Sequence, residues 1–223
     1  MKEIVYKVPT KTNDSYNYSD KFLGWFTSRG ISKQTLVSNR VAEGLEYMPQ
    51  VNKEVTTIQF KYYRDSSLVN IKYRDGRKNF KLYKGAEKVF YNINSVVGYD
   101  WCVVVEGEMD VLALHEAGIK NAISVPNGAT LNTNNLDYLD NCIDYLDDKT
   151  KIILAVDADE AGQALRQEFI RRLGAEVCYL VDFNGQKDAN EYLIENGPEK
   201  LRNAIHASKQ VPLEGVTTLY DIH

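Results

Sequence analysis

The sequence predicts an α/β protein in which a mainly parallel sheet with helices on both faces follows a smaller α+β subdomain. Four apolar runs alternate with helical patterns after Trp101, and this alternation predicts the parallel sheet. Before residue 98 the runs are instead joined by hairpin-turn signals, which predict an antiparallel sheet. We therefore expect one domain over residues 1–98, a second over 99–207, and a linker or tail over 208–223.

The N-terminal half begins with residues 1–17, which are polar and lack periodicity, so we expect a loose arm. Two helices are predicted next, because Ser19 or Asp20 can cap the first and Ser32 the second, and Gly30 separates them. These helices should span residues 18–29 and 32–39. Strands are then expected near residues 56–63, 68–73 and 79–83, with hairpin turns at 64–67 and 75–76.

The second half reads as four βα units, which implies parallel strands with crossover helices. The strands are expected at residues 102–105, 122–125, 151–156 and 176–181. The helices are expected at residues 108–117, about 134–146, 160–173 and 188–195. Gly118 and Gly174 mark the ends of the first and third helices.

Composition is ordinary for a globular protein, with 43% hydrophobic and 26% charged residues in 223. No apolar run approaches the ~18 residues of a membrane-spanning helix, and the first residues lack a signal-peptide core, so we expect a cytoplasmic protein without a membrane partner. Cys102, Cys142 and Cys178 are widely spaced and should be buried thiols. Because no Cys-x-x-Cys occurs, we expect no zinc in this chain.

Basic and acidic residues are distributed unevenly along the chain, whose net charge is −4. Residues 1–98 hold 17 basic and 9 acidic side chains, a net +8, whereas residues 99–223 hold 10 and 22, a net −12. The basic residues are densest between Lys61 and Lys88. A basic part joined to an acidic part suggests polyanion binding beside metal-assisted chemistry, although a solvated basic surface is the simpler alternative.

Acidic residues end two of the predicted parallel strands. Glu106 follows the run of residues 103–105, and Asp157 and Asp159 follow the run of residues 152–156. In open parallel sheets the carboxyl edge of the strands holds the active site, so we expect these three carboxylates in one small volume. Crowded carboxylates repel each other and require a cation, and all-oxygen ligands suit Mg²⁺ or Mn²⁺.

Two further acids belong to the same edge. Asp110 lies four residues after Glu106, and Asp188 follows the fourth strand. Gly107 removes a side chain where a phosphate would approach the turn. The alternative is that such acids only cap helix N-termini, which applies to Glu108, Glu160 and Asp188. Acids at three separate strand ends favour a metal site over capping alone.

The pattern of these residues resembles the Toprim domain shared by bacterial-type primases, topoisomerases and some nucleases. The resemblance is carried by Glu106-Gly107-x-x-Asp110, by Asp157-x-Asp159 and by the motif of residues 187–191, Lys-Asp-Ala-Asn-Glu. It is strongest to the primase part of phage-type replicative primase–helicases. The segment of residues 74–81 resembles their basic hairpin, and residues 26–32 resemble the helical turn before it.

The resemblance implies a DNA primase that joins ribonucleotides on single-stranded DNA by metal-dependent nucleotidyl transfer. It implies Mg²⁺ or Mn²⁺ held among five carboxylates, namely Glu106, Asp110, Asp157, Asp159 and Asp188. Three of these, Glu106, Asp157 and Asp159, are the candidate catalytic residues, and Glu106 is the candidate proton acceptor. The candidate nucleotide- and DNA-binding residues are Arg74, Arg77, Lys78 and Lys81.

Two departures from the primase–helicase pattern leave alternatives open. We find neither an N-terminal zinc module nor the phosphate-binding loop of a helicase, and residues 208–223 resemble the linker that leads to one. The expected partners are a single-stranded DNA template, ribonucleoside triphosphates and a replicative helicase in cis or in trans, in a bacterial or phage-infected cell. A Toprim nuclease and a non-catalytic DNA-binding module of a helicase are the rival interpretations.

Overall fold

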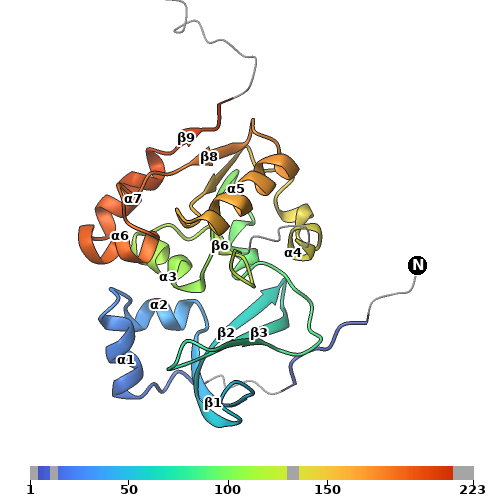
Figure 1. Cartoon of the computed structure of the whole chain (residues 1–223), viewed down its shortest axis with the longest axis vertical. Helices are drawn as coiled ribbons and strands as arrows, with labels where there is room; N and C mark the ends of the chain where they lie inside the picture. The colour runs from blue at the N-terminus through green and yellow to red at the C-terminus, as the bar shows by residue number, and fades with distance from the viewer. Residues whose placement is uncertain (1–4, 11–14, 130–135, 213–223) are drawn as a thin grey trace, which may run out of the picture.

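Two sheets stacked along the longest axis of the molecule organise the chain (Figure 1). The computed structural model describes residues 5–10, 15–129 and 136–212. The first sheet is antiparallel and belongs to the N-terminal half, and the second is mainly parallel and belongs to the C-terminal half. The predicted mixed architecture is therefore confirmed.

The N-terminal half starts with the two predicted helices, α1 (Asp20–Thr27) and α2 (Lys33–Ser38). The Ser19 hydroxyl accepts a hydrogen bond from the main-chain N–H of Phe22 at 3.2 Å, and Ser32 caps α2 in the same way. A four-stranded sheet follows, in the order β1-β2-β3-β4. Its strands are β1 (Ala42–Met48), β2 (Lys53–Arg64), β3 (Ser67–Asp75) and β4 (Phe80–Leu82).

Strand β1 was absent from the sequence prediction. It is an edge strand in which Gly44 and two glutamates dilute the apolar pattern, and its Leu45 and Tyr47 are exposed.

The hairpin between β3 and β4 was predicted, and the structure explains its tightness. The Asp75 carboxylate accepts hydrogen bonds from the N–H groups of Arg77 and Asn79, at 2.8 and 2.9 Å.

The C-terminal sheet has the order β6-β5-β7-β8-β9, and only β9 is antiparallel to its neighbour. The strands are β5 (Trp101–Val105), β6 (Ala122–Ser124), β7 (Lys151–Leu154), β8 (Cys178–Leu180) and β9 (Lys209–Gln210). The helices are α3 (Glu108–Glu116), α4 (Asp137–Asp140), α5 (Glu160–Leu173), α6 (Ala189–Asn196) and α7 (Pro198–His206), with 3-10 turns η1 (Ile93–Val96) and η2 (Ile143–Tyr145).

The crossover helices lie on both faces of this sheet, as predicted. From β5 the chain moves through α3 to β6 on one side, and from β7 it moves through α5 to β8 on the other. Because both crossovers are expected to be right-handed, opposite directions of travel place α3 and α5 on opposite faces. Helices α6 and α7 pack with α3 (Figure 1).

Three differences from the prediction concern the second half. The helix expected at 134–146 is wrong in its described part, which contains only α4 and η2. Asp140, Asn141 and Asp144 occupy this segment, and such side chains compete for main-chain hydrogen bonds. Helix α7 was missed although Pro198 at its first turn signalled it. The two-residue strand β9 lies where a linker was expected.

A single hydrophobic cluster connects the two halves. Phe26 of α1 and Phe60 of β2 belong to the same cluster as Val104 of β5. Tyr91 lies between the halves. The centre of its ring is 5.8 Å from the centre of the Phe60 ring, and its hydroxyl donates a hydrogen bond to the carbonyl of Asn39 at 3.0 Å. The predicted boundary at residue 98 falls between the two sheets, and the division into domains remains a prediction.

Cys102, Cys142 and Cys178 are buried free thiols, as the sequence predicted. Burial raises the pKa of the Cys102 thiol to about 12, which makes it unreactive near neutral pH. Among the described residues, no helix has both the length and the apolar character needed to cross a bilayer.

Candidate metal and nucleotide site

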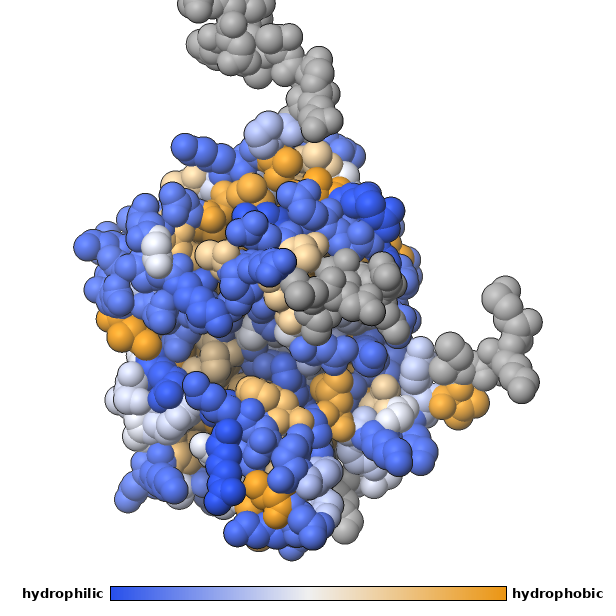
Figure 2. Space-filling view, viewed as in Figure 1, coloured by the Kyte–Doolittle hydropathy of each residue, from blue (hydrophilic) through white to orange (hydrophobic). Residues whose placement is uncertain are grey.

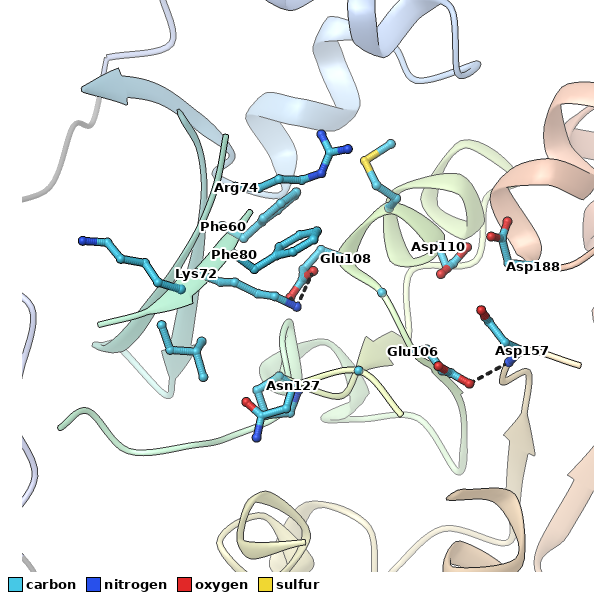
Figure 3. Close-up of a pocket in the computed structure, with 16 residues that line it drawn as sticks. Phe60, Lys72, Arg74, Phe80, Glu106, Glu108, Asp110, Asn127, Asp157 and Asp188 are labelled. Atoms are coloured by element: carbon cyan, nitrogen blue, oxygen red, sulfur yellow. Dashed lines mark hydrogen bonds and ion pairs between the residues drawn. The ribbon is translucent and has the colours of Figure 1, made fainter. Parts of the chain in front are cut away.

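An open cleft of about 470 Å³ lies between the N-terminal sheet and the carboxyl edge of the parallel sheet. One wall is basic and aromatic and comes from strands β2 to β4, and the other is acidic and comes from the strand ends of the second sheet (Figure 3). The cleft is lined by Phe60, Lys72, Arg74, Phe80, Lys81, Leu82, Glu106, Gly107, Glu108, Met109, Asp110, Pro126, Asn127, Gly128, Asp157 and Asp188.

The carboxylates of Glu106, Asp110, Asp157 and Asp188 point into the same part of this cleft (Figure 3). Glu106 follows β5, and its carboxylate accepts hydrogen bonds from the main-chain N–H of Asp157 at 2.9 Å and of Ala129 at 3.2 Å. Asp110 lies in the first turn of α3 and accepts from the N–H of Asn190 at 3.1 Å. The main chain therefore fixes these two acids, and it also holds Asp188, whose carboxylate accepts from the N–H of Glu191.

Crowding and burial change the acidity of this group. Burial, followed by the charge of Asp157, raises the pKa of the Glu106 carboxyl to about 7. Burial, followed by the charges of Asp188 and Asp157, raises the pKa of Asp110 well above its ordinary value. Burial and the neighbouring carboxylates thus destabilise the ionised forms of both groups, and a bound cation would offset both effects.

Lys187 provides the cation nearest to these acids. Its ammonium group lies 2.9 Å from the Asp157 carboxylate, and the Lys187 side chain remains 56% exposed. The hydrogen bond and charge of Asp157 raise the pKa of Lys187, while burial raises the pKa of Asp157 against the opposing effect of Lys187. An exposed lysine can leave its partner at low cost, so Asp157 is available to another cation.

Asp159 and Asp188 both cap helices, as the alternative interpretation of the sequence anticipated for Asp188. The Asp159 carboxylate accepts from the N–H of Gly162 at the start of α5, and the Asp188 carboxylate accepts from Glu191 at the start of α6. Asp188 nevertheless lines the cleft. Asp159 is exposed and does not line the cleft, but it lies close enough for its charge to add to burial in raising the pKa values of Glu106 and Asp157.

The donor chemistry of the acidic wall fits a hard divalent cation, because every candidate ligand is a carboxylate oxygen. In the ranges 5–10, 15–129 and 136–212, however, no three His, Cys, Asp or Glu side chains are arranged around one point as ready ligands. Present hydrogen bonds to the main chain and to Lys187 hold the carboxylates apart from that arrangement. A metal would be held after Lys187 withdraws and side chains rotate.

Two glycines allow the acidic loops to approach each other. A Cβ atom at Gly162 would overlap the main-chain oxygen of Asp157 and would lie 2.5 Å from the Glu106 carboxylate, which is closer than real Cβ atoms come. A Cβ atom at Gly107 would lie 3.1 Å from the Asp110 carboxylate. The first turn of α5 can therefore pack directly against the loop that bears Asp157.

The opposite wall contains a buried ion pair that sequence reasoning did not find. Lys72 of β3 lies 2.9 Å from the carboxylate of Glu108 in α3, and the Tyr62 hydroxyl donates to the same carboxylate. The side chains of Lys72 and Glu108 are only 10% and 4% exposed. Glu108 therefore links the antiparallel sheet to α3 instead of acting as a simple cap. The role of Lys72 could not be predicted from the sequence, because it occupies an ordinary strand position.

The four predicted nucleotide-binding cations are not all in one place. Arg74 lines the cleft beside Phe80 (Figure 3). Its guanidinium lies 4.5 Å from the centre of the Trp25 ring and 5.7 Å from that of Phe80. Lys81 lines the cleft and pairs with Glu46 at 2.6 Å. Arg77 and Lys78 are exposed in the hairpin turn, outside the lining. Phe80 is 45% exposed and is the accessible aromatic ring of this wall.

Comparisons with known proteins show similarity to the Toprim-like family and to primase homologues. Residues 103–193 match the Toprim-like family. A primase homolog protein of Arabidopsis thaliana is 36% identical over 212 residues, which cover 87% of this chain and 61% of that protein. The Twinkle homolog protein of the same plant, described as chloroplastic/mitochondrial, is 33% identical over 219 residues, covering 91% of this chain and 30% of that protein. The chain thus spans less than two thirds of these relatives.

Two solved structures have the same fold over most of this chain. The crystal structure of the primase fragment of the bacteriophage T7 primase-helicase matches with a TM-score of 0.66 and 26% identity, over 80% of this chain and 72% of that one. The primase domain of a bacteriophage T7 assembly bound to an RNA/DNA hybrid and dTTP matches with a TM-score of 0.66 and 25% identity, over 82% and 91%.

Proposed function

Because this chain belongs to the Toprim-like family and is homologous to DNA primases, we propose that it synthesises short RNA primers on single-stranded DNA by metal-dependent nucleotidyl transfer. The observation that carries the proposal is the pairing of two walls across one cleft. Four carboxylates, on Glu106, Asp110, Asp157 and Asp188, face a wall that bears the guanidinium of Arg74 and the ammonium of Lys81. Acids suit metal ions, and cations suit the phosphates of a nucleotide or a template.

The reaction would join the 3′-hydroxyl of one nucleotide to the α-phosphate of the next, with pyrophosphate as the leaving group. Mg²⁺ or Mn²⁺ held by the acidic wall would supply charge neutralisation for the triphosphate and would acidify the hydroxyl. Glu106, whose carboxyl pKa is raised to about 7, is the proposed proton acceptor. Asp159 caps α5 with one carboxylate oxygen, and its other oxygen would be the one to join the ligand set.

The basic wall would hold the substrates. Arg74 is fixed by its contacts with Trp25 and Phe80, so its guanidinium would be preorganised for a phosphate. The exposed ring of Phe80 would stack on a base of the template or of the incoming nucleotide. Arg77 and Lys78, in the exposed turn, would contact template phosphates outside the cleft.

The partners in this proposal are a single-stranded DNA template, ribonucleoside triphosphates and a replicative helicase in cis or in trans. Support comes from the relative described as a primase-helicase and from the relative described as bound to an RNA/DNA hybrid and dTTP. A cytoplasmic location in a bacterial or phage-infected cell remains a prediction, and one plant relative is described as chloroplastic/mitochondrial.

The proposal is tested by incubating the chain with a single-stranded template, ribonucleotides and Mn²⁺. We expect short oligoribonucleotides that depend on the template, and more product when a preformed dinucleotide replaces the initiation step. Metal-dependent shortening of the template without any extension would establish the nuclease instead. Template binding with neither extension nor shortening, with or without an added replicative helicase, would identify a non-catalytic DNA-binding module.

The basic hairpin should contribute salt-sensitive DNA binding. We expect Arg77→Ala together with Lys78→Ala to weaken single-stranded DNA binding, because both side chains are exposed at the turn. The slope of log affinity against log salt should become shallower by about 0.7 for each phosphate that the variant no longer neutralises. Fluorescence anisotropy at several salt concentrations measures both. Lys200→Ala, at an exposed lysine of α7, is the matched control, and equal effects of the two changes would reduce the hairpin to a solvated surface.

A further inference from the structure

A second recess, of about 550 Å³, lies beyond the strand ends of β7 and β8, on the side away from the basic hairpin. Helix α5 contributes Arg166 to it, the loop after β8 contributes residues 182, 183 and 185–187, and the segment around β9 contributes Lys209. The surface over β8 and β9 mixes apolar and polar atoms (Figure 2). Lys187 lines this recess and lies near the catalytic cleft. No described residue lines both, so the recess is separate from the cleft.

The charge of this recess is opposite to that of its surroundings. Arg166, Lys187 and Lys209 line it, against a single acid, Asp182. Residues 99–223 as a whole carry a net charge of −12, so three cations in one recess are a local exception. Arg166 and Lys209 make no ion pair with any residue in the described part of the chain, whereas Arg171 and Arg172 of the same helix both pair with Glu168. The recess is therefore suited to an anion.

Two buried polar atoms in the recess lack hydrogen-bond partners among the residues that the structure describes. These are the Nε atom of Arg166, a donor, and the side-chain carbonyl oxygen of Gln186, an acceptor. Native structures rarely leave such atoms unsatisfied, because a buried donor or acceptor without a partner loses its hydrogen bonds to water and gains none in return. The amide nitrogen of Gln186 is held by Glu195 at 2.7 Å, which keeps the amide oxygen oriented. A ligand that supplies both an acceptor and a donor would satisfy both atoms.

The remaining wall of the recess is apolar. Val156, Leu180, Phe183 and Pro212 contribute side chains to it. An apolar wall beside a cationic group and an oriented amide acceptor matches the parts of a nucleotide. The base face would lie on the apolar wall, its amino group would donate to Gln186, and its phosphate would accept from Arg166 and Lys209.

We propose that this recess binds a nucleotide, either free or as part of a strand, at a site separate from the catalytic cleft. The proposal rests on the proposed function in one respect, because nucleotides are then the substrates that reach this edge of the sheet. Lys187 would connect the two sites. It pairs with Asp157 in the cleft wall and lines the recess, so a phosphate in the recess would compete with Asp157 for the ammonium group.

The test is photolabelling of the whole chain with 8-azido-ATP in EDTA, followed by mass spectrometry of the labelled peptides. EDTA makes the readout independent of metal in the cleft. We expect label within residues 180–187 or 207–212. Arg166→Gln or Lys209→Gln should reduce labelling at these peptides by roughly tenfold at limiting probe, because a charge-assisted hydrogen bond is lost. Asp182→Asn should increase it, since one negative charge leaves the recess.

Arg171→Gln is the matched control, with the same charge change at an exposed position of the same helix. Arg166→Lys should retain part of the labelling, which separates loss of the site from loss of the fold. Lys209 is exposed, so Lys209→Gln tests the same site without a risk of unfolding. Competition by inorganic pyrophosphate and unlabelled ATP, but not by oligothymidylate, would indicate a free nucleotide. Competition by oligothymidylate would indicate a nucleotide within a strand.

Label confined to peptides of the cleft, or equal labelling of wild type, Arg166→Gln and Lys209→Gln, would overturn the inference. Failure of the proposed function is distinguishable from this. A chain that labels in the recess but makes no oligoribonucleotides would refute primer synthesis and leave the nucleotide site standing.

Discussion

Glu106→Gln is expected to abolish oligoribonucleotide synthesis, by at least about 100-fold, while leaving single-stranded DNA binding unchanged. The glutamine keeps one oxygen that can accept the main-chain N–H of Asp157, but its amide nitrogen cannot accept the N–H of Ala129. It removes the negative charge that the acidic wall would offer to a metal ion. Because burial and the charge of Asp157 destabilise the ionised Glu106, loss of that charge offsets the lost bond to Ala129, and the metal-free variant should melt close to the wild-type temperature.

The same variant tests metal binding without any activity. In the wild type, Mg²⁺ or Mn²⁺ at about 100 times its dissociation constant should add about 2.7 kcal/mol of stability, which for a chain of this size is roughly 5 to 11 °C in Tm. We expect this rise to be lost in Glu106→Gln and kept in the control Glu160→Gln, at an exposed position of α5. A full metal-dependent rise in Glu106→Gln would contradict the metal assignment.

Lys72→Met is expected to destabilise the protein by about 3–5 kcal/mol, which lowers Tm by roughly 6 to 20 °C. The change leaves Glu108, only 4% exposed, as a buried carboxylate whose remaining partner is the hydroxyl of Tyr62. Breaking one side of a buried pair costs more than the pair itself contributes, because the residual charge has neither water nor a countercharge. Thermal or denaturant unfolding of the purified variant measures the effect.

Two further variants separate charge from packing. Lys53→Met makes the same substitution at an exposed position of β2 and should have little effect on Tm. Lys72→Met combined with Glu108→Gln should be more stable than Lys72→Met alone, because the uncompensated charge is gone and the amide can still accept from Tyr62. A double variant no more stable than the single one would show that Lys72 acts through packing and not through the ion pair.

The acidic wall could be predicted from the chain because its signal is local. Glu106 and Asp157 directly follow β-branched runs, and carboxyl ends of adjacent parallel strands must meet at one edge. Strands β5 and β7 are indeed neighbours, with Val104 paired to Leu154. Asp188 was identified for the same reason. The helix caps at Ser19 and Ser32 were also local, since each serine bonds to an N–H three residues away.

Other features depended on long-range contacts and could not be read from the chain. Nothing local distinguishes Lys72, which becomes buried only because α3 brings Glu108 against β3. Lys81 belonged to the predicted cationic group, but β1, a strand the sequence did not reveal, supplies Glu46 as its partner. The orientation of Asp159 was equally open, because only the packed structure shows that its carboxylate caps α5 without lining the cleft, whereas Asp188 does both.

The sequence by itself determined the order of the elements, the parallel sheet and the edge at which the acids gather, because periodicity, caps and strand ends are properties of neighbouring residues. Only the tertiary structure decided which charges compensate one another. The pairing of Lys187 with Asp157 and of Lys72 with Glu108, and the Nε atom of Arg166 that is unsatisfied within the described residues, follow from how the two sheets and α5 pack. Burial and distance set the strength of each charge interaction, and neither is encoded by spacing along the chain.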